Sequence, residues 1–362
     1  MLLVLLACSG SPDPADPADS GHPDDTAPAV PVDCDAVTGT GSVVLLGRAV
    51  DASPVLPTAA PEVETQPTGF AGPDALGRYY LAELTGVVRR SDDGGCAWRE
   101  VGLLPGGRGE GGETETADTG PGPGWVYYDL FATGGRVYAY SPGTLLVSTD
   151  GVDWTRVAEV SFRAPAQLVA DPADPDRLRS YGAEGVVTST DAGATWSATP
   201  APDPDVWYNV GIDAADIDRV ALGRRGVWVT DDGGATWTTR SYDGSPLPAW
   251  DDGALYAFNH GGDDDADYHL RKSTDAGATF NDLPIGNDPT LSLSELGVDA
   301  GLVVTGGYRY VSGEPVEGVI QRTTASGNGV VRVPGYEGVV GIAFGDDRVL
   351  VALMGPSVET PD

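Results

Sequence analysis

The chain has 362 residues, and its 21 Lys and Arg against 54 Asp and Glu give a formal charge of −33. With Lys272 as its single lysine, a chain this acidic is repelled by phosphate backbones and anionic lipid surfaces, which excludes nucleic-acid binding. The 51 Gly and 29 Pro are typical of all-β or disordered proteins, whereas 14 Tyr, 8 Trp and a hydrophobic fraction of 41% exceed what a disordered chain carries. The composition therefore predicts a large all-β core.

The chain begins Met1-Leu-Leu-Val-Leu-Leu-Ala-Cys8, a short apolar run that ends in a small residue and a cysteine. This segment resembles the lipobox of bacterial lipoprotein signal peptides, which implies cleavage before Cys8 and lipid attachment to it. The resemblance predicts an exported protein, lipid-anchored at the outer membrane or cell surface. The run is short and no Lys or Arg precedes it, so a start codon assigned too late, or an accidental apolar start, is the alternative.

Residues 9–33 follow the predicted signal peptide of residues 1–8 and contain Pro, Asp and Ser repeatedly but no aromatic residue. Such a segment cannot bury a core, and its prolines and like charges keep it extended. We expect a disordered stalk there, a folded domain over residues 34–356 and a short disordered tail over 357–362. No run of 18 apolar residues occurs, so no spanning helix is expected.

The folded part repeats one short pattern, which we call the repeat turn: a Ser or Thr, an Asp two residues later, then Gly and an aromatic residue. Five copies begin at Ser91, Ser148, Ser189, Thr230 and Ser273, and their aspartates are Asp93, Asp150, Asp191, Asp232 and Asp275. A sixth, eroded copy begins at Thr323. The hydroxyl and carboxylate can accept backbone N–H groups of a tight turn and the glycine supplies a positive φ, so we expect these aspartates to be structural.

These segments resemble the Asp-box, or BNR, repeat of sialidases, sortilin-type receptors and photosystem-assembly propellers. The resemblance implies a β-propeller in which each repeat turn joins the third and fourth strands of a blade. Blades that contain a copy of the repeat turn are expected to begin near residues 66, 123, 165, 205, 248 and 289. The apolar segment 42–50 would complete a seventh blade with strands over 339–344 and 348–354, which otherwise expose an edge. The fold prediction is thus all-β, a single seven-bladed propeller, with six blades as the alternative.

Two cysteines, Cys34 and Cys96, are left once Cys8 carries lipid, and an even pair in an exported protein favours a disulfide. Cys34 precedes the closing strand, and Cys96 lies in the repeat turn of the first blade. A bridge between them would hold the ring at its closure. Two free thiols are the alternative.

A candidate ligand face lies opposite the repeat turns, where the loops that lead into each blade collect. Trp125, Trp207 and Trp250 each stand 23 residues before a repeat turn, so we expect them at the start of innermost strands, around the mouth of a central channel. Arg163, Arg224 and Arg309 are expected near them, and arginines bind carboxylates well. Aromatic residues that merely plug the channel are the alternative.

Two weaker motifs complete the candidates. The segment Phe162-Arg163-Ala164-Pro165 is similar to the arginine motif of sialidases, but it follows the second repeat turn and no nucleophile or acid can be assigned with it. The loop with Asp263, Asp265 and Asp267 has oxygen ligands that suit Ca²⁺, but no EF-hand spacing, so a solvated acidic loop is favoured.

The sequence therefore predicts a lipid-anchored, exported propeller that acts as a non-catalytic binding or assembly scaffold at the cell envelope. The alternative is a glycoside hydrolase or lyase of propeller type. We expect no cofactor, a monomer, and an envelope protein or glycan as the ligand.

Overall fold

The computed structural model describes residues 34, 42–50, 66–105, 128–162, 167–203, 208–242, 244–259, 268–285, 291–311 and 314–355. The chain divides into two compact units, Met1–Val30, of which no residue is described, and Pro31–Asp362, which holds all the described residues. In the described part every regular element is a β-strand, and no helix there has the length and hydrophobicity to cross a membrane.

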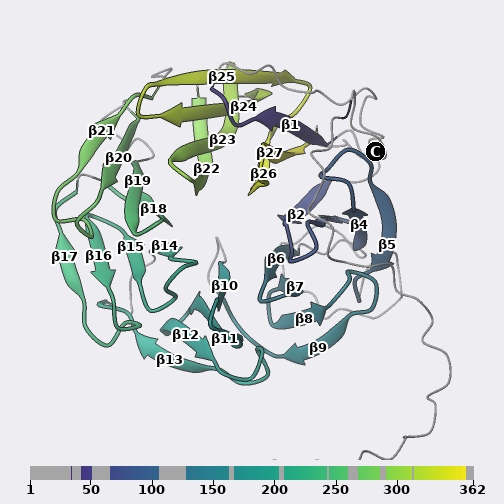
Figure 1. The fold of residues 1–362 in the computed structure, drawn as a ribbon, viewed down its shortest axis with the longest axis horizontal. Helices are drawn as coiled ribbons and strands as arrows, with labels where there is room; N and C mark the ends of the chain where they lie inside the picture. The colour runs from purple at the N-terminus through teal and green to yellow at the C-terminus, as the bar shows by residue number, and fades with distance from the viewer. Residues whose placement is uncertain are drawn as a thin grey trace, which may run out of the picture. The chain divides into compact units, whose positions relative to one another are not determined.

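The strands form seven antiparallel sheets, which are the blades of a ring (Figure 1). Blade 1 consists of β2 (Pro67–Ala71), β3 (Tyr79–Glu83), β4 (Val87–Ser91) and β5 (Arg99–Leu103). Blade 2 consists of β6 (Asp129–Thr133), β7 (Arg136–Ser141), β8 (Thr144–Ser148) and β9 (Thr155–Ala158). Blade 3 consists of β10 (Leu168–Asp171), β11 (Asp174–Gly182), β12 (Gly185–Ser189) and β13 (Ser197–Pro200). Blade 4 consists of β14 (Asn209–Ile212), β15 (Val220–Gly223), β16 (Val227–Thr230) and β17 (Thr238–Arg240). Blade 5 consists of β18 (Pro246–Asp251), β19 (Ala254–Asn259), β20 (His269–Ser273) and β21 (Asn281–Leu283). Blade 6 consists of β22 (Leu291–Asp299), β23 (Leu302–Val311), β24 (Glu314–Thr324) and β25 (Gly327–Pro334). Blade 7 consists of β26 (Gly338–Phe344), β27 (Arg348–Met354) and β1 (Val43–Gly47).

Each of blades 1 to 6 places its strands in chain order from the ring centre outward, so the first strand of a blade is its innermost strand (Figure 1). Innermost strands of neighbouring blades contact one another at six of the seven junctions, including β26 with β2 where the ring closes, and blades 3 and 4 meet through β11 and β14. The prediction of an all-β, seven-bladed propeller is confirmed, and the six-bladed alternative is wrong.

The ring closes through the N-terminal strand, as the sequence predicted. In blade 7, β1 pairs with β27, with Val43 opposite Ala352 and Leu46 opposite Val349. Because strand side chains alternate between two faces, Val43 and Leu45 pack toward blade 1 while Val44 and Leu46 pack toward blade 6. These four side chains are at most 4% exposed, so this one strand joins two hydrophobic clusters.

A disulfide joins Cys34 to Cys96, which are 62 residues apart in sequence and have Cα atoms 5.6 Å apart. The predicted pairing is therefore present. Cys96 is buried in the cluster that blade 7 shares with blade 1, beside Trp98 and Leu350. The bridge thus ties the residues before β1 to the blade that follows the closure.

Blade 6 differs from the five blades before it in two ways. The eroded copy at Thr323 is not a repeat turn, because β24 continues to Thr324 and β25 begins at Gly327 after a tight turn. The second and third strands of the blade also form a longer hairpin, in which β23 and β24 are 10 and 11 residues long.

Candidate functional site

The five repeat turns share one hydrogen-bond pattern. In blade 3, the Ser189 hydroxyl donates to Oδ1 of Asp191 and accepts the N–H of Gly193, both at 2.8 Å, and Oδ1 of Asp191 also accepts the N–H of Thr195 at 2.8 Å. Gly193 has a φ of +94°, which favours glycine there. The corresponding hydroxyl–carboxylate pairs are Ser91–Asp93, Ser148–Asp150, Thr230–Asp232 and Ser273–Asp275.

These hydrogen bonds favour the ionised carboxylates. Bonds from Thr236 and Thr230 lower the pKa of Asp232 to about 2. Bonds from Thr279 and Ser273 lower the pKa of Asp275 to about 2 as well. These two carboxylates are engaged by their own turns, which leaves them poorly suited to exchange a proton near neutral pH.

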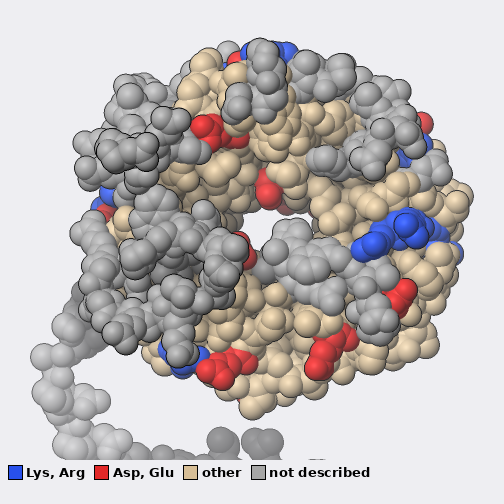
Figure 2. All heavy atoms as spheres, turned by 180° about the vertical axis from the view of Figure 1, so that it is seen from behind, with Lys and Arg blue, Asp and Glu red and all other residues tan. Residues whose placement is uncertain are grey.

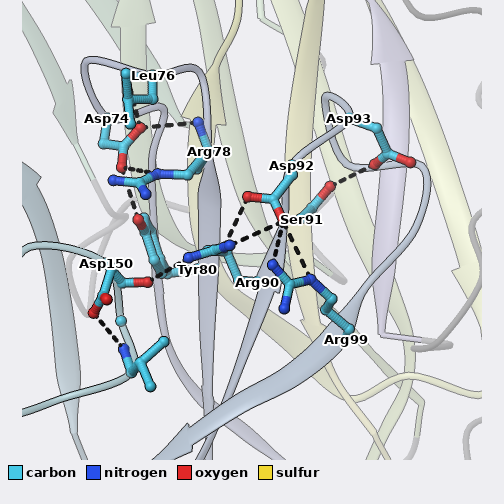
Figure 3. Close-up of polar contacts among 12 residues, drawn as sticks. Asp74, Leu76, Arg78, Tyr80, Arg90, Ser91, Asp92, Asp93, Arg99 and Asp150 are labelled. Atoms are coloured by element: carbon cyan, nitrogen blue, oxygen red, sulfur yellow. Dashed lines mark hydrogen bonds and ion pairs between the residues drawn. The ribbon is translucent and has the colours of Figure 1, made fainter. Parts of the chain in front are cut away.

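The same face of the ring carries polar contacts at every junction between blades. From blade 1, Arg78 and Arg90 donate to the carbonyl oxygens of Thr149 and Asp150 in the repeat turn of blade 2, at 2.9 and 2.8 Å. Figure 3 shows this junction, with Asp74 bound to Arg78 and Tyr80. At the other junctions, arginines of one blade donate hydrogen bonds to the next blade: Arg136 to Asp176, Arg177 and Arg179 to Asp218, Arg240 to the carbonyl of Ala276, Arg322 to the carbonyls of Gly47 and Ala49, and Arg348 to the sulfur of Cys96. Between blades 5 and 6, the carboxylate of Asp251 accepts the N–H of Gly301.

Because the whole chain has only 21 Lys and Arg, these junctions take a large share of its positive charge. Arg322 is an example: it is 2% exposed and donates to the carbonyl of Gly47, the last residue of β1, at 2.8 Å and to that of Ala49 at 2.7 Å. The repeat-turn face is therefore held together by groups that are already bonded to the protein itself.

The structure describes one of the three predicted tryptophans and corrects its position. Trp250 is the fifth residue of the six-residue strand β18, beside the hairpin to β19, and not at the start of that strand. It is 8% exposed, packs among Leu255, Val229 and Tyr242, and has the Arg219 guanidinium 5.4 Å from its ring centre. A buried indole at the repeat-turn end of its strand offers no stacking surface at the opposite mouth.

The equal spacing of the tryptophans was misleading because the connections between strands differ in length between blade 5 and blade 4. Trp250 pairs with Leu255, which pairs with the first residue of its repeat turn, Ser273. In blade 4, Ile212 pairs with Val220, and Val220 pairs with Thr230, the first residue of that repeat turn. Ile212 is therefore the residue of blade 4 that is equivalent to Trp250. The short β18–β19 hairpin and the longer connection from β19 to β20 compensate in chain length, so Trp250 corresponds in space to Ile212 and not to Trp207.

Two of the predicted arginines are described. Arg224 lies in the turn between β15 and β16 and is half-buried. Arg309, on β23, forms an ion pair with Glu317 on β24, and Glu317 also pairs with Arg332 at 3.0 Å. The structure does not bring these arginines together at one site. Cys8, Trp125, Trp207, Arg163 and the three aspartates Asp263, Asp265 and Asp267 lie outside the described residues.

At the centre of the ring is a channel with a cavity of about 330 Å³, lined by residues of six of the seven blades. Figure 2 shows the opening, with acidic side chains at its wall. Most of the residues that line it are apolar in type, among them Phe70, Phe131 and Ile342, but polar atoms contribute more of the wall surface than apolar atoms do, and the lining includes Asp129 of β6 and Glu295 of β22. Glu295 follows a bulge in β22, where the pairing with β23 shifts by one residue.

The two channel carboxyls are the most strongly perturbed acids described. Glu295 lines the channel, and desolvation, with a smaller contribution from the charge of Asp129, raises its pKa to about 8. Desolvation raises the pKa of Asp129 to about 6. Neither carboxyl has a hydrogen-bond or ion-pair partner within the described part of the chain. Neither residue was predicted from the sequence, although an acid inside an apolar strand segment is a signal that was available.

Among the described residues, no group of three His, Cys, Asp or Glu side chains is arranged to hold a metal ion. The predicted acidic loop over 263–267 lies outside those residues.

Comparisons with known proteins agree with the fold. The family model described as the DUF6242 beta propeller domain matches residues 114–210. A curated Paenibacillus protein named xyloglucanase is 26% identical over 184 residues, which are 46% of this chain and 17% of that protein. This chain therefore spans less than a fifth of the length of that relative.

Two solved structures are similar over almost their full length. YCF48 from Cyanidioschyzon merolae is 12% identical, with a TM-score of 0.51 over 86% of this chain and 98% of that one. A structure of YCF48 bound to D1 peptide is 11% identical, with a TM-score of 0.53 over 90% of this chain and 99% of that one. At these identities, the similarity shows a shared propeller fold.

Proposed function

We propose that this protein is a non-catalytic binding scaffold that receives a peptide segment of another envelope protein at the mouth of its central channel. One observation carries the proposal. The arginines at the blade junctions of the repeat-turn face are bonded to neighbouring blades, whereas the channel carboxyls of Asp129 and Glu295 have no partner in the described part of the chain. The peptide-bound structure of YCF48 supports a peptide as the class of ligand, since that protein shares the fold.

The proposal extends to the cellular location of the protein. The resemblance of the first eight residues to a lipobox supports export and lipid attachment at Cys8, and residues 9–33 would hold the propeller away from the membrane. The five repeat turns would then be Asp boxes with a structural role, and the closed ring would act as a monomer.

The test is an array of envelope-derived peptides and glycans probed with the full chain. We expect peptides to bind, and we expect the isosteric channel variant Glu295→Gln to change which peptides bind. Asp191→Ala serves as the control, because this residue lies in a repeat turn away from the channel. Binding of glycans alone, or equal peptide binding by the channel variant, would contradict the proposal.

A glycoside hydrolase is the second candidate, and a specific observation favours it. The pKa values of Asp129 and Glu295 are raised to about 6 and about 8, and two carboxyls held at different pKa values can serve as base and acid. The match to a xyloglucanase points to the same class. Release of reducing ends from xyloglucan by the wild type, lost in both Asp129→Asn and Glu295→Gln, would replace the scaffold proposal, and absence of any release would remove this candidate.

A further inference from the structure

We propose that the central channel binds an organic cation, an ammonium or guanidinium group on an apolar stem, between Asp129 of β6 and Glu295 of β22. The inference rests on the proposed function and deepens it, because Lys and Arg side chains of a bound peptide have this chemistry. A free alkylamine has it too, so the experiment below separates these sources.

The shape of the channel fits such a group. The cavity of about 330 Å³ lies at the lower end of the roughly 300–1,000 Å³ typical of small-molecule sites. Phe70, Phe131 and Leu296 contribute apolar surface to its wall. Apolar walls suit the methylene stem of the ligand, and aromatic rings attract cations.

The charges of the channel are one-sided. Among the described lining residues, Asp129 and Glu295 are the only ionisable ones, and no Lys, Arg or His lines the cavity. The residues from β2, β10, β14 and β26 are apolar, and Gln167, just before β10, uses its side-chain oxygen to accept the N–H of Ile212 at 3.0 Å. Tyr140 on β7 also interacts with the charge of Asp129, but its hydroxyl is hydrogen-bonded to the backbone of Phe162. A cation would therefore supply the partner that these carboxyls lack.

A metal ion suits the channel less well. Ca²⁺ takes six to eight oxygen ligands, and the described side chains of the wall offer two carboxyls and an amide oxygen that already accepts a hydrogen bond. A hydrated ion would also gain nothing from the apolar side chains of the wall, such as Phe70 and Phe131. An organic cation uses both the carboxyls and the apolar surface.

Binding of such a group should be coupled to proton release. In the free protein Glu295 is largely protonated at neutral pH, because its pKa is raised to about 8. A bound cation favours the ionised carboxylate, so the protein should release a proton on binding, and affinity should increase as the pH rises from 6 to 8. An ammonium group with an ordinary pKa near 10.4 stays charged over this range.

The experiment is isothermal titration calorimetry of the full chain with three cationic probes: a capped Gly-Lys-Gly peptide, a capped Gly-Arg-Gly peptide and n-butylammonium. A capped Gly-norleucine-Gly peptide is the uncharged control for the lysine probe. Each titration is run at pH 6 and pH 8, in two buffers that differ in ionisation enthalpy, so that released protons are counted. Glu295→Gln and Asp129→Asn are the channel variants, and Glu159→Gln is the control variant, because this side chain is 80% exposed and distant in the sequence from both carboxyls.

We expect at least one cationic probe to bind the wild type and Glu159→Gln alike, with tighter binding at pH 8. We expect each channel variant to weaken this binding about tenfold or more while its melting temperature shows that it is folded. Equal binding of the norleucine peptide, unchanged binding by Glu295→Gln, or no binding of any cationic probe would overturn the inference. If uncharged peptides bind the wild type at the channel mouth, the proposed scaffold function stands while this inference fails.

Discussion

Replacing Glu295 with Gln should make the stability of the protein less dependent on pH. The substitution keeps the shape of the side chain and removes its ionisation. Below pH 4.5, the ordinary pKa of this group, the carboxyl is protonated in the folded and unfolded chains alike, so wild type and variant should differ little. Above that pH the unfolded wild type releases the proton while the folded protein retains it up to about pH 8, so wild-type stability falls as the pH rises.

The size of the effect follows from the interval between the two pKa values. From 4.5 to about 8 it is about 3.5 pH units, and 1.36 kcal/mol per unit gives an upper limit of about 5 kcal/mol at pH 8 and above. At pH 7 the limit is about 3 kcal/mol by the same arithmetic. Water in the channel reduces these limits, because it solvates the carboxylate on its open side.

The assay is urea unfolding of wild type and Glu295→Gln at pH 4, 6 and 8, followed by tryptophan fluorescence. The excess stability of the variant should be near zero at pH 4 and should grow with pH. With Asp129→Asn in both proteins, the excess should begin to rise at the same pH but level off at a lower pH and a smaller value, because without the charge of Asp129 the pKa of Glu295 lies lower. A stability difference that is the same at all three pH values would show that burial does not hold the Glu295 carboxyl in its neutral form.

Three further predictions concern the stability of the fold and the cellular location of the protein. Ser189→Ala should destabilise the protein by about 1–3 kcal/mol, measured by urea unfolding, because it leaves the buried N–H of Gly193 without an acceptor. Reducing the Cys34–Cys96 bridge should lower the melting temperature, since the closed loop of 62 residues contributes about 4 kcal/mol by the loop-entropy relation; an unchanged melting temperature would mean that the closure holds without it. Cys8→Ser should move the protein to the soluble fraction and abolish labelling by a palmitate analogue, and unchanged membrane partition would refute the predicted lipid attachment.

The sequence predicted the architecture well because the repeat turn is encoded locally. The hydroxyl of Ser189, the carboxylate of Asp191 and the positive φ of Gly193 all lie within five residues, so the pattern can be recognised without knowledge of the fold. Closure by β1 was also predictable, since two unpaired apolar strands at the end of the chain need a third strand.

The site was harder to predict because it depends on positions that only the ring brings together. Asp129 and Glu295 belong to blades 2 and 6, and their proximity follows from the channel, not from any spacing along the chain. Trp250 shows the opposite error, in which equal spacing along the chain suggested an equivalence that strand pairing does not support. Residue counting fails wherever a hairpin shortens and a neighbouring connection lengthens by a similar amount.

The distribution of charge connects the scaffold with the proposed ligand. The arginines that hold neighbouring blades together lie on the repeat-turn face, whereas the described channel wall has acids and no cations, within a chain whose formal charge is −33. A negative field of this kind steers cationic partners inward and raises their association rate, and salt screens it with a Debye length of about 8 Å at physiological ionic strength. Association of a Lys-containing peptide should therefore slow as salt increases, while a norleucine peptide should show little change. The contacts inside the channel are screened less, so dissociation should depend on salt much more weakly than association.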